Sequence, residues 1–211
     1  VDHVRSVGTQ AFQLWMNRDM RGLGWRGPAA NLSGFVEPFD TWADMSHLLP
    51  EESWRAPVRS IAYFCSVLPD PGTPESAADP AHHRAQRARV RDNAVRFLDR
   101  DIAALWPDAA TPADGFRWEV LACDAEREDR AAKGPARFDS QFWTANTSPS
   151  ERYVLSLPGT SRYRLSPLDM SFDNLTIAGD WTETGLNTGC VESAVISGML
   201  AAHALAGSPR L

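Results

Sequence analysis

The stretch from Asp173 to Leu205 constrains the fold of this chain more than any other part. It starts with a short apolar run, Leu175 to Ala178, which predicts a buried strand, and it continues through a polar connection. A long helix is expected from Gly189 onward, because apolar and small residues then recur along one face; they are Val191, Ala194, Val195, Gly198, Met199, Ala202 and Leu205. Gly207 and Pro209 end this helix.

A strand, a polar turn and a helix in this order suit an electron-rich ligand. The helix N-terminus carries unpaired backbone N–H groups and a partial positive charge. Gly189 would let a ligand approach the backbone closely, and Asp180 at the strand end can accept hydrogen bonds from the hydroxyls of a polyol. An ordinary strand–helix unit with a capped helix has the same spacing, so both interpretations stay open at this point.

Upstream of this segment the pattern mixes strands with one strong helix. The apolar run at 7–16 could be a strand or a short helix, and its strand-forming residues favour a strand. Further runs predict strands at 60–68, 116–123 and 153–157, and residues 163–165 could continue the last pairing. Helical spacing predicts a helix over 81–105 that Pro107 ends. We therefore expect an α+β (α/β) fold in two parts, residues 1–150 and 151–211.

Composition excludes several classes of function. The net charge of the 211 residues is −6, which argues against nucleic acid as a partner. Cys65, Cys123 and Cys190 are far apart, and the five histidines have no neighbours at metal-ligand spacing, so we expect neither a disulfide framework nor a metal site. No apolar run is long enough to span a bilayer, and a reducing, cytoplasmic setting is the default.

The string from Asn174 to Gly198, NLTIAGDWTETGLNTGCVESAVISG, resembles the C-terminal flavin-binding signature of the flavin amine oxidase and phytoene desaturase superfamily. The resemblance implies that the strand end at Gly179 and Asp180 binds the ribityl chain of FAD. It implies that the backbone at Gly189, Cys190 and Val191 faces the pyrimidine edge of the flavin. The connection from Trp181 to Asn187 would line the flavin side of a substrate cavity.

Further upstream the resemblance is weaker and concerns the fold. Residues 1–150 would form part of a substrate domain, a mixed sheet with helices, and residues 151–211 would supply the last strand and helix of a Rossmann-like FAD-binding domain. The resemblance implies an FAD-dependent oxidoreductase that removes a hydride from an amine or an isoprenoid-type substrate; with a lipid substrate the protein would be peripheral to a membrane. No residue is a convincing catalytic acid or base, so the catalytic residues are unknown. The alternative is a flavin-free scaffold or interaction module that retains the fold.

The fingerprint that would hold the ADP half of FAD is not evident. The string Gly22-Leu-Gly-Trp-Arg-Gly27 matches G-x-G-x-x-G, but no buried strand precedes it and no long helix follows it. The chain also begins at Val1 rather than Met, which suggests a C-terminal portion of a longer protein. We therefore expect this chain alone to bind FAD weakly or not at all and to be inactive. A missing N-terminal FAD-binding segment or a second copy would cover the strand at 175–178.

Two further sets of residues have a structural and a functional interpretation. Cys190 at the helix N-terminus could be reactive or linked to flavin, but a small packed residue is the simpler interpretation. Large aromatic residues could line an apolar cavity, although core packing is favoured; they are Trp15, Trp42, Trp54 and Trp143.

Overall fold

The computed structural model describes residues 3–54, 57–69, 79–123 and 132–210. The chain divides into two compact units. The larger comprises Thr9–Ser148, and the smaller combines Val1–Gly8 with Pro149–Leu211. Helices and antiparallel sheets occur together, as the sequence predicts for a mixture of α and β structure.

The larger unit is built on a five-stranded sheet in the order β3-β4-β5-β2-β8. The strands are β2 (Thr9–Met16), β3 (Asn31–Leu32), β4 (Thr41–Asp44), β5 (Ser60–Val67) and β8 (Phe142–Asn146). Every pairing in this sheet is antiparallel, with Phe12 opposite Phe64 on β5 and Trp143 on β8. The expected mixed sheet is therefore wrong for this unit, because each of the four pairings among its described strands is antiparallel.

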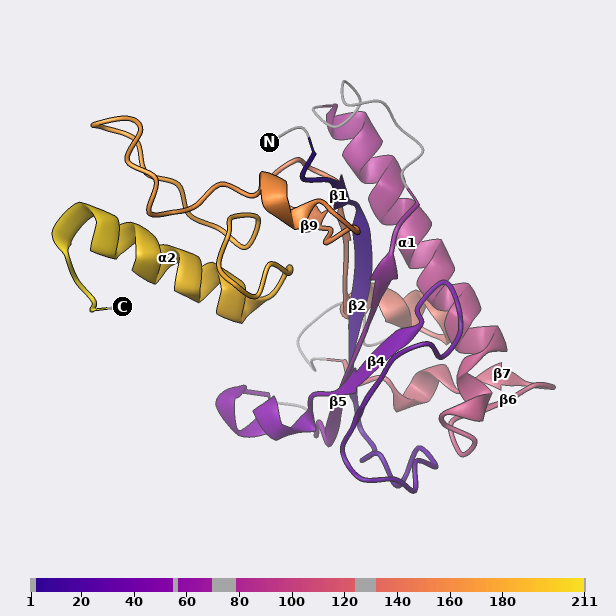
Figure 1. Ribbon diagram of the computed structural model, residues 1–211. Helices are drawn as coiled ribbons and strands as arrows, with labels where there is room; N and C mark the ends of the chain where they lie inside the picture. Colours follow the sequence, from indigo (N-terminus) through magenta and orange to yellow (C-terminus); the bar gives the residue numbers. More distant parts are fainter. Residues whose placement is uncertain (1–2, 55–56, 70–78, 124–131, 211) are drawn as a thin grey trace. The chain divides into compact units, whose positions relative to one another are not determined.

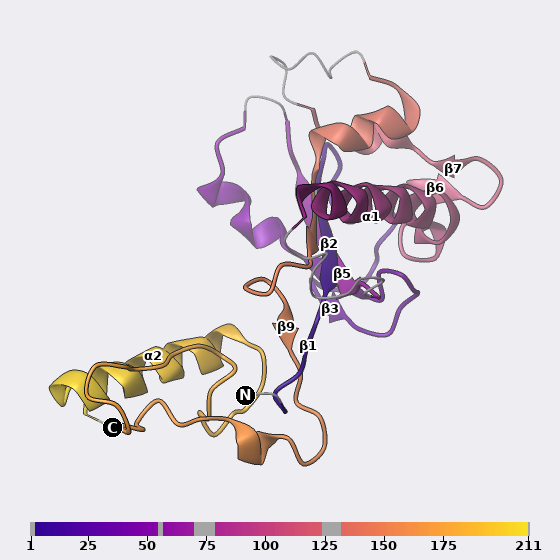
Figure 2. The ribbon, with the colours of Figure 1, turned by 90° about the horizontal axis from the view of Figure 1, so that it is seen from above.

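One face of this sheet carries the core. Phe12, Leu14 and Met16 alternate with Gln13 and Trp15 along β2, and the first three are fully buried. Helix α1 (Pro80–Arg100) lies along this side of the sheet, as Figures 1 and 2 both show. Its buried residues are Gln86, Val90, Ala94, Phe97 and Leu98.

Helix α1 begins and ends near its predicted limits. Asp79 caps it, because the Asp79 carboxylate accepts a 2.8 Å hydrogen bond from the Ala81 N–H, and Pro80 occupies the first turn. The helix ends at Arg100, and a 3₁₀ turn, Ile102–Ala104, continues to Leu105. The predicted helix over 81–105 is thus a helix followed by a tighter turn.

The interior of the sheet unit also contains the fully buried amide side chain of Gln10. The Gln10 side chain donates to the carbonyl oxygens of Pro38 at 3.0 Å and Val67 at 3.1 Å, and it accepts a hydrogen bond from Asn93 on α1 at 3.0 Å. These bonds join β2, β5 and α1 at one point, so a buried polar group is fully used there.

One predicted strand of the larger unit takes another form, and one strand was not predicted. The expected strand over 116–123 is wrong: β7 (Gly115–Phe116) pairs with β6 (Ala110–Thr111), and a 3₁₀ helix, Trp118–Val120, follows. Leu121 makes an isolated bridge to Met16, so this segment closes the end of β2 instead of extending the sheet. The sequence analysis also missed β8 as a strand.

The smaller unit contains few regular elements. β1 (Ser6–Val7) pairs antiparallel with β9 (Tyr153–Val154), a 3₁₀ helix spans Ser161–Tyr163, and α2 covers Val191–Ala206. The helix predicted from the apolar spacing is confirmed, and Gly207 ends it in the left-handed conformation with φ 66°. The continuation predicted at 163–165 is wrong, since Tyr163 ends a 3₁₀ helix.

The strand predicted at 175–178 is also wrong. None of these residues is in a strand, because a strand needs the backbone of a neighbour and no described residue provides it. Leu175 is 53% exposed, and the Thr176 hydroxyl is buried without a hydrogen-bond partner in the described part of the chain. The Rossmann-like strand therefore does not form among these residues.

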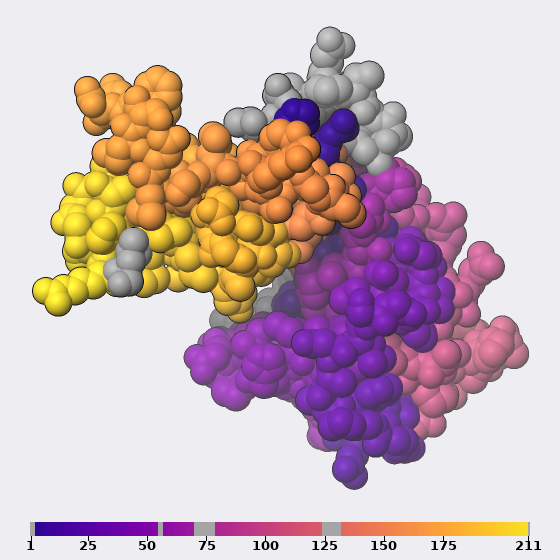
Figure 3. Space-filling model, viewed as in Figure 1, coloured from indigo at the N-terminus to yellow at the C-terminus, as the bar shows by residue number. Residues whose placement is uncertain are grey.

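The buried face of α2 is the opposite of the one expected. Val191, Val195, Met199 and Leu205 are exposed, with Val191 at 76%, and Figure 3 shows α2 (yellow) at the surface. The side chains that α2 buries are small and mostly polar: Ser193, Ser197 and Ala201. Among the described residues, no helix is long and apolar enough to cross a membrane.

A pH effect follows from Tyr63 in β5. Burial raises the pKa of Tyr63 to about 12, and the neighbouring Cys65 contributes; burial and Asp40 also raise the pKa of the Cys65 thiol. The neutral phenol is therefore favoured in the folded protein. We expect Tyr63 to make its full contribution to the free energy of unfolding below pH about 10. That contribution should fall by about 2 kcal/mol as the pH rises to about 12.

Absorbance titration at the tyrosinate band and urea unfolding at several alkaline pH values measure this effect. Tyr63→Phe should remove the titration step near pH 12. A Tyr63→Phe protein that keeps that step and the same alkaline loss of stability would contradict the assignment.

Candidate functional site

The predicted site segment folds as a polar loop against the buried face of α2. The Ser197 hydroxyl accepts a 2.9 Å hydrogen bond from the Gly179 N–H and shares a 2.7 Å bond with the Thr182 hydroxyl. One turn nearer the helix N-terminus, the Ser193 hydroxyl shares a 2.7 Å bond with the Thr184 hydroxyl. The loop therefore runs along α2 toward its N-terminus, with Gly179 beside Ser197 and Thr184 beside Ser193.

A buried arginine holds the other side of this loop. The Arg164 guanidinium donates to the carbonyl oxygens of Asp180 at 2.6 Å and Thr182 at 3.3 Å. It also donates to the Ser156 hydroxyl at 3.1 Å, and that hydroxyl in turn donates to the Asn187 carbonyl oxygen. The backbone between 180 and 187 is thus fixed from both sides.

Asp180 and Trp181 open onto one cavity of about 320 Å³ in the smaller unit. Ser6, Ser150 and Arg152 line it as well, together with Val4, Pro149 and Val154. Among the described residues, the Asp180 carboxylate has no hydrogen-bond or ion-pair partner. Its oxygens are therefore available to a ligand that carries hydroxyl groups.

At two of the predicted glycines, the packing of neighbouring residues leaves no room for a side chain, which the sequence does not indicate. Gly179 has φ +135°, and a Cβ atom there would lie 2.6 Å from the Trp181 indole. A Cβ atom on Gly189 would lie 2.8 Å from the Tyr153 ring and 3.1 Å from the Val154 carbonyl oxygen. Gly189 therefore lets the loop pack on β9, which is a reason independent of any ligand.

The remaining predicted residues lie at the start of α2. Asn187 is left-handed with φ 53°, and its side-chain oxygen accepts a 3.1 Å hydrogen bond from the Thr184 N–H. The Cys190 thiol caps the helix by accepting from the Ser193 N–H at 3.4 Å. This contact gives Cys190 a structural role, in agreement with the simpler interpretation, and leaves Val191 exposed in the first turn.

The structure thus brings Asp180 and Trp181 to one cavity and places Asn187, Gly189, Cys190 and Val191 outside its lining. The step from Ser197 to Ser193 is one helical turn, about 6 Å along the axis, so the loop at Asp180 and the N-terminus of α2 lie at different positions along the helix. Arg164 and Ser193 were not predicted at this site, and the hydrogen bonds of Thr182 and Thr184 to α2 were not predicted either. The signal was available as serines four residues apart in an otherwise apolar helix.

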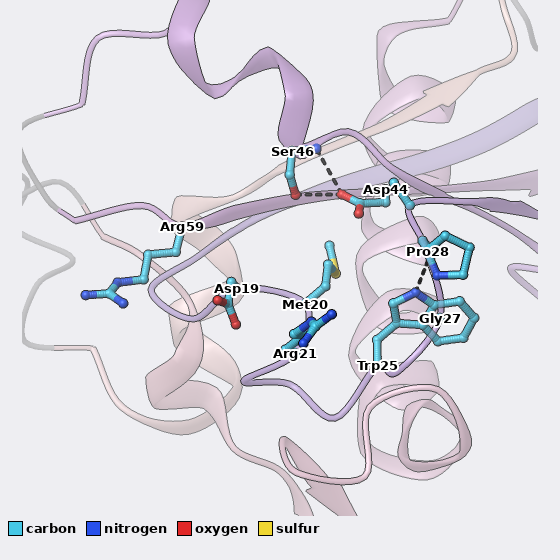
Figure 4. A pocket seen from close by; sticks show the side chains of 10 residues that line it. Asp19, Met20, Arg21, Trp25, Gly27, Pro28, Asp44, Ser46 and Arg59 are labelled. Atoms are coloured by element: carbon cyan, nitrogen blue, oxygen red, sulfur yellow. Dashed lines mark hydrogen bonds between the residues drawn. The ribbon is translucent and has the colours of Figure 1, made fainter.

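A second cavity, of about 390 Å³, lies in the larger unit at the loop that carries the G-x-G-x-x-G string. Figure 4 shows Trp25 and Pro28 on one wall and Asp44 with Ser46 on another, and Asp19 also lines it. The Trp25 indole donates to the Pro28 carbonyl oxygen at 2.8 Å, and Asp44 accepts from the Ser46 hydroxyl at 2.6 Å.

Close packing explains the glycines at two positions of this loop. A Cβ atom on Gly24 would lie 2.7 Å from Pro107, and one on Gly27 would lie 2.6 Å from the Trp25 ring. The loop leads from β2 to β3 with no helix after it, so rejection of the string as a dinucleotide fingerprint is confirmed.

The tryptophans considered as cavity residues divide between two roles. Trp42 is fully buried in the core, and the partly buried Trp143 packs against the same core. Trp15 and Trp54 each donate an indole N–H to the Glu52 carboxylate, at 2.7 and 2.6 Å. In the described ranges, no group of three His, Cys, Asp or Glu side chains could hold a metal ion.

Comparison with known proteins adds one finding. A family model described as flavin containing amine oxidoreductase matches residues 9–206. No curated protein and no solved structure matches the chain.

Proposed function

The chain belongs to the family of flavin-containing amine oxidoreductases, and on that basis we propose that residues 179–191 hold the isoalloxazine and ribityl groups of FAD. The observation that supports this most directly is the Asp180 carboxylate, which lines a cavity beside Trp181 and has no partner among the described residues. A polyol chain offers the hydroxyl donors that such a carboxylate can accept. The residues present therefore fit the group.

The N-terminus of α2 supplies the second half of the proposed contact. The N–H groups of Val191 and Glu192 have no intrahelical acceptor, and the first turn of a helix favours negative charge. The pyrimidine edge of a reduced flavin is anionic, so these N–H groups would stabilise it. Gly179 and Asn187, which both have a positive φ, set the path of the loop between the two contacts.

Bound FAD would supply the hydride acceptor for oxidation of a C–N or C–C bond. The contribution of this chain is to orient the flavin and to exclude water near it. We propose an amine or isoprenoid-type substrate, since the family contains amine oxidoreductases and the residues lining the Asp180 cavity include the apolar Val4, Val154 and Trp181.

The pyrophosphate of FAD needs a second anchor, which we propose lies in another segment of the complete protein. The G-x-G-x-x-G loop at Gly22 cannot serve, because it does not open a helix. The exposed face of α2 and the exposed Leu175 side chain are the surfaces that such a segment, or a second copy of the chain, would cover. We expect these 211 residues alone to bind FAD weakly and to be inactive.

Titration of the full-length protein with FAD, followed by flavin fluorescence, tests the proposed function. Asp180→Ala should weaken FAD binding about tenfold, which corresponds to the loss of about 1.4 kcal/mol of hydrogen bonding. Asp180→Asn keeps one acceptor oxygen and should lose less. Glu183→Ala, an exposed neighbour on the same loop, is the matched control and should bind FAD as the unchanged protein does.

A flavin-free interaction module remains the second candidate, and one observation favours it. Gly189 is required by Tyr153 without any ligand, and the apolar face of α2 is open. FAD should raise the melting temperature of an FAD-dependent enzyme and leave that of a scaffold unchanged. If the full-length protein is colourless and its melting temperature does not change when FAD is added, the result would support a scaffold function and exclude an FAD-dependent oxidoreductase.

A further inference from the structure

Arg164 is a charged side chain in a position where burial needs an explanation. It is 6% exposed and follows the 3₁₀ helix Ser161–Tyr163. Its hydrogen-bond acceptors are the carbonyl oxygens of Asp180 and Thr182 and the hydroxyl of Ser156, all of which are neutral. In the part of the chain that the structure describes, no carboxylate lies within ion-pair distance of its guanidinium.

Burial of a cation without a counter-ion is unfavourable by several kcal/mol, and hydrogen bonds to neutral acceptors recover a part of that cost. The planar guanidinium suits this position, because one rigid group reaches two carbonyl oxygens and a hydroxyl. A lysine would place a charge there but could not hold all three acceptors in the same geometry. The positive charge therefore remains beneath the loop that presents Asp180.

We propose that Arg164 is a positioning residue of the flavin site: it fixes the backbone of residues 180–187, and its buried positive charge favours negative charge on the group bound there. The first half concerns this chain alone, and the second half rests on the proposed function. The bond at 2.6 Å to the Asp180 carbonyl oxygen sets the backbone from which the Asp180 carboxylate reaches the cavity. The charge would then stabilise the reduced, anionic flavin more than the oxidised flavin.

Hydrogen exchange on the flavin-free chain tests the first half. In Arg164→Met, the amides of residues 179–187 should exchange about tenfold faster, because the loop loses its bonds on one side. Arg162→Met is the matched control: Arg162 lies two residues earlier, contacts Tyr163 and is exposed, so exchange in the loop should not change. Unchanged exchange in Arg164→Met would overturn the positioning role.

The second half needs the full-length protein and its flavin. Arg164→Met should weaken the binding of reduced FAD about tenfold more than that of oxidised FAD, a fall of about 30 mV in the two-electron midpoint potential. Arg164→Lys keeps the charge, so it should accelerate loop exchange but retain most of the potential. If Arg164→Met does not fold, hydrogen exchange in Arg164→Lys tests the positioning role in its place.

The outcomes separate the two claims. Faster loop exchange with an unchanged midpoint potential in Arg164→Met would overturn the electrostatic role and leave a structural arginine. A full-length protein that binds no FAD would refute the proposed function, while loop exchange in the flavin-free chain would still decide whether Arg164 positions the loop.

Discussion

Replacement of Phe12 by alanine should destabilise the larger unit by about 3–5 kcal/mol, the cost of removing a buried aromatic ring from a packed core. Phe12 is fully buried at the centre of the sheet. Its ring lies 4.7 Å from Phe64, 4.6 Å from Phe39, 5.8 Å from Phe138 and 6.2 Å from Phe97, measured between centroids. These partners come from β5, α1, the loop at Phe39 and the 3₁₀ helix Gly134–Ser140, so the cavity left by alanine cannot be filled by one local shift.

Urea unfolding of the larger unit, followed by tryptophan fluorescence, measures the loss. Phe142→Ala on β8 is the matched control, because Phe142 is 49% exposed and its removal should cost less than about 1 kcal/mol. Equal costs for the two substitutions would show that the cluster around Phe12 is not the core of this unit.

Replacement of Ser197 by valine should release the site loop from α2. Valine places methyl groups where serine has its hydroxyl, so the Gly179 N–H loses its partner, whereas the Thr182 hydroxyl keeps its 2.8 Å hydrogen bond to the Gly179 carbonyl oxygen. One unsatisfied N–H group corresponds to about 2 kcal/mol, which should accelerate exchange of the Gly179 amide about 30-fold.

The exposed side of the same helix provides the control. Val195 is 55% exposed, and Val195→Ser should leave exchange at Gly179 unchanged. If Ser197→Val has no more effect on the loop than Val195→Ser, the polar contact between the loop and α2 does not hold the site. The full-length protein should show the same difference in its affinity for FAD.

Much of the larger unit follows from local pattern. The strand-forming residues Phe12, Leu14 and Trp15 favour a strand over 7–16 rather than a short helix, and the structure has it as β2, which buries Phe12, Leu14 and Met16. The spacing of Val90, Ala94 and Phe97 likewise predicts α1. The same reasoning gave a wrong strand over 116–123. Residues of this segment alternate in burial because the segment closes the end of β2, and not because it pairs along its length with a neighbouring strand.

The site was predictable as a sequence segment and not as a set of contacts. Asp180 and Trp181 were found by resemblance, and the structure opens both onto one cavity. Arg164 gave no signal, since an isolated arginine between Tyr163 and Leu165 is typical of an exposed turn. Its burial depends on three acceptors that are distant in the sequence.

The sequence alone determined the position of α2, its end at Gly207 and the family signature around Asp180, because helix spacing, helix caps and motifs are local properties of the chain. Only the tertiary structure decided which face of α2 is buried. Apolar spacing predicts a buried stripe through Val191, Val195 and Met199, but Ser193 and Ser197 make the contacts instead. The physical reason is that a helix buries the face for which the rest of the chain supplies contacts. The hydroxyl groups of the site loop bond Ser193 and Ser197, whereas an apolar face is buried only where another surface covers it.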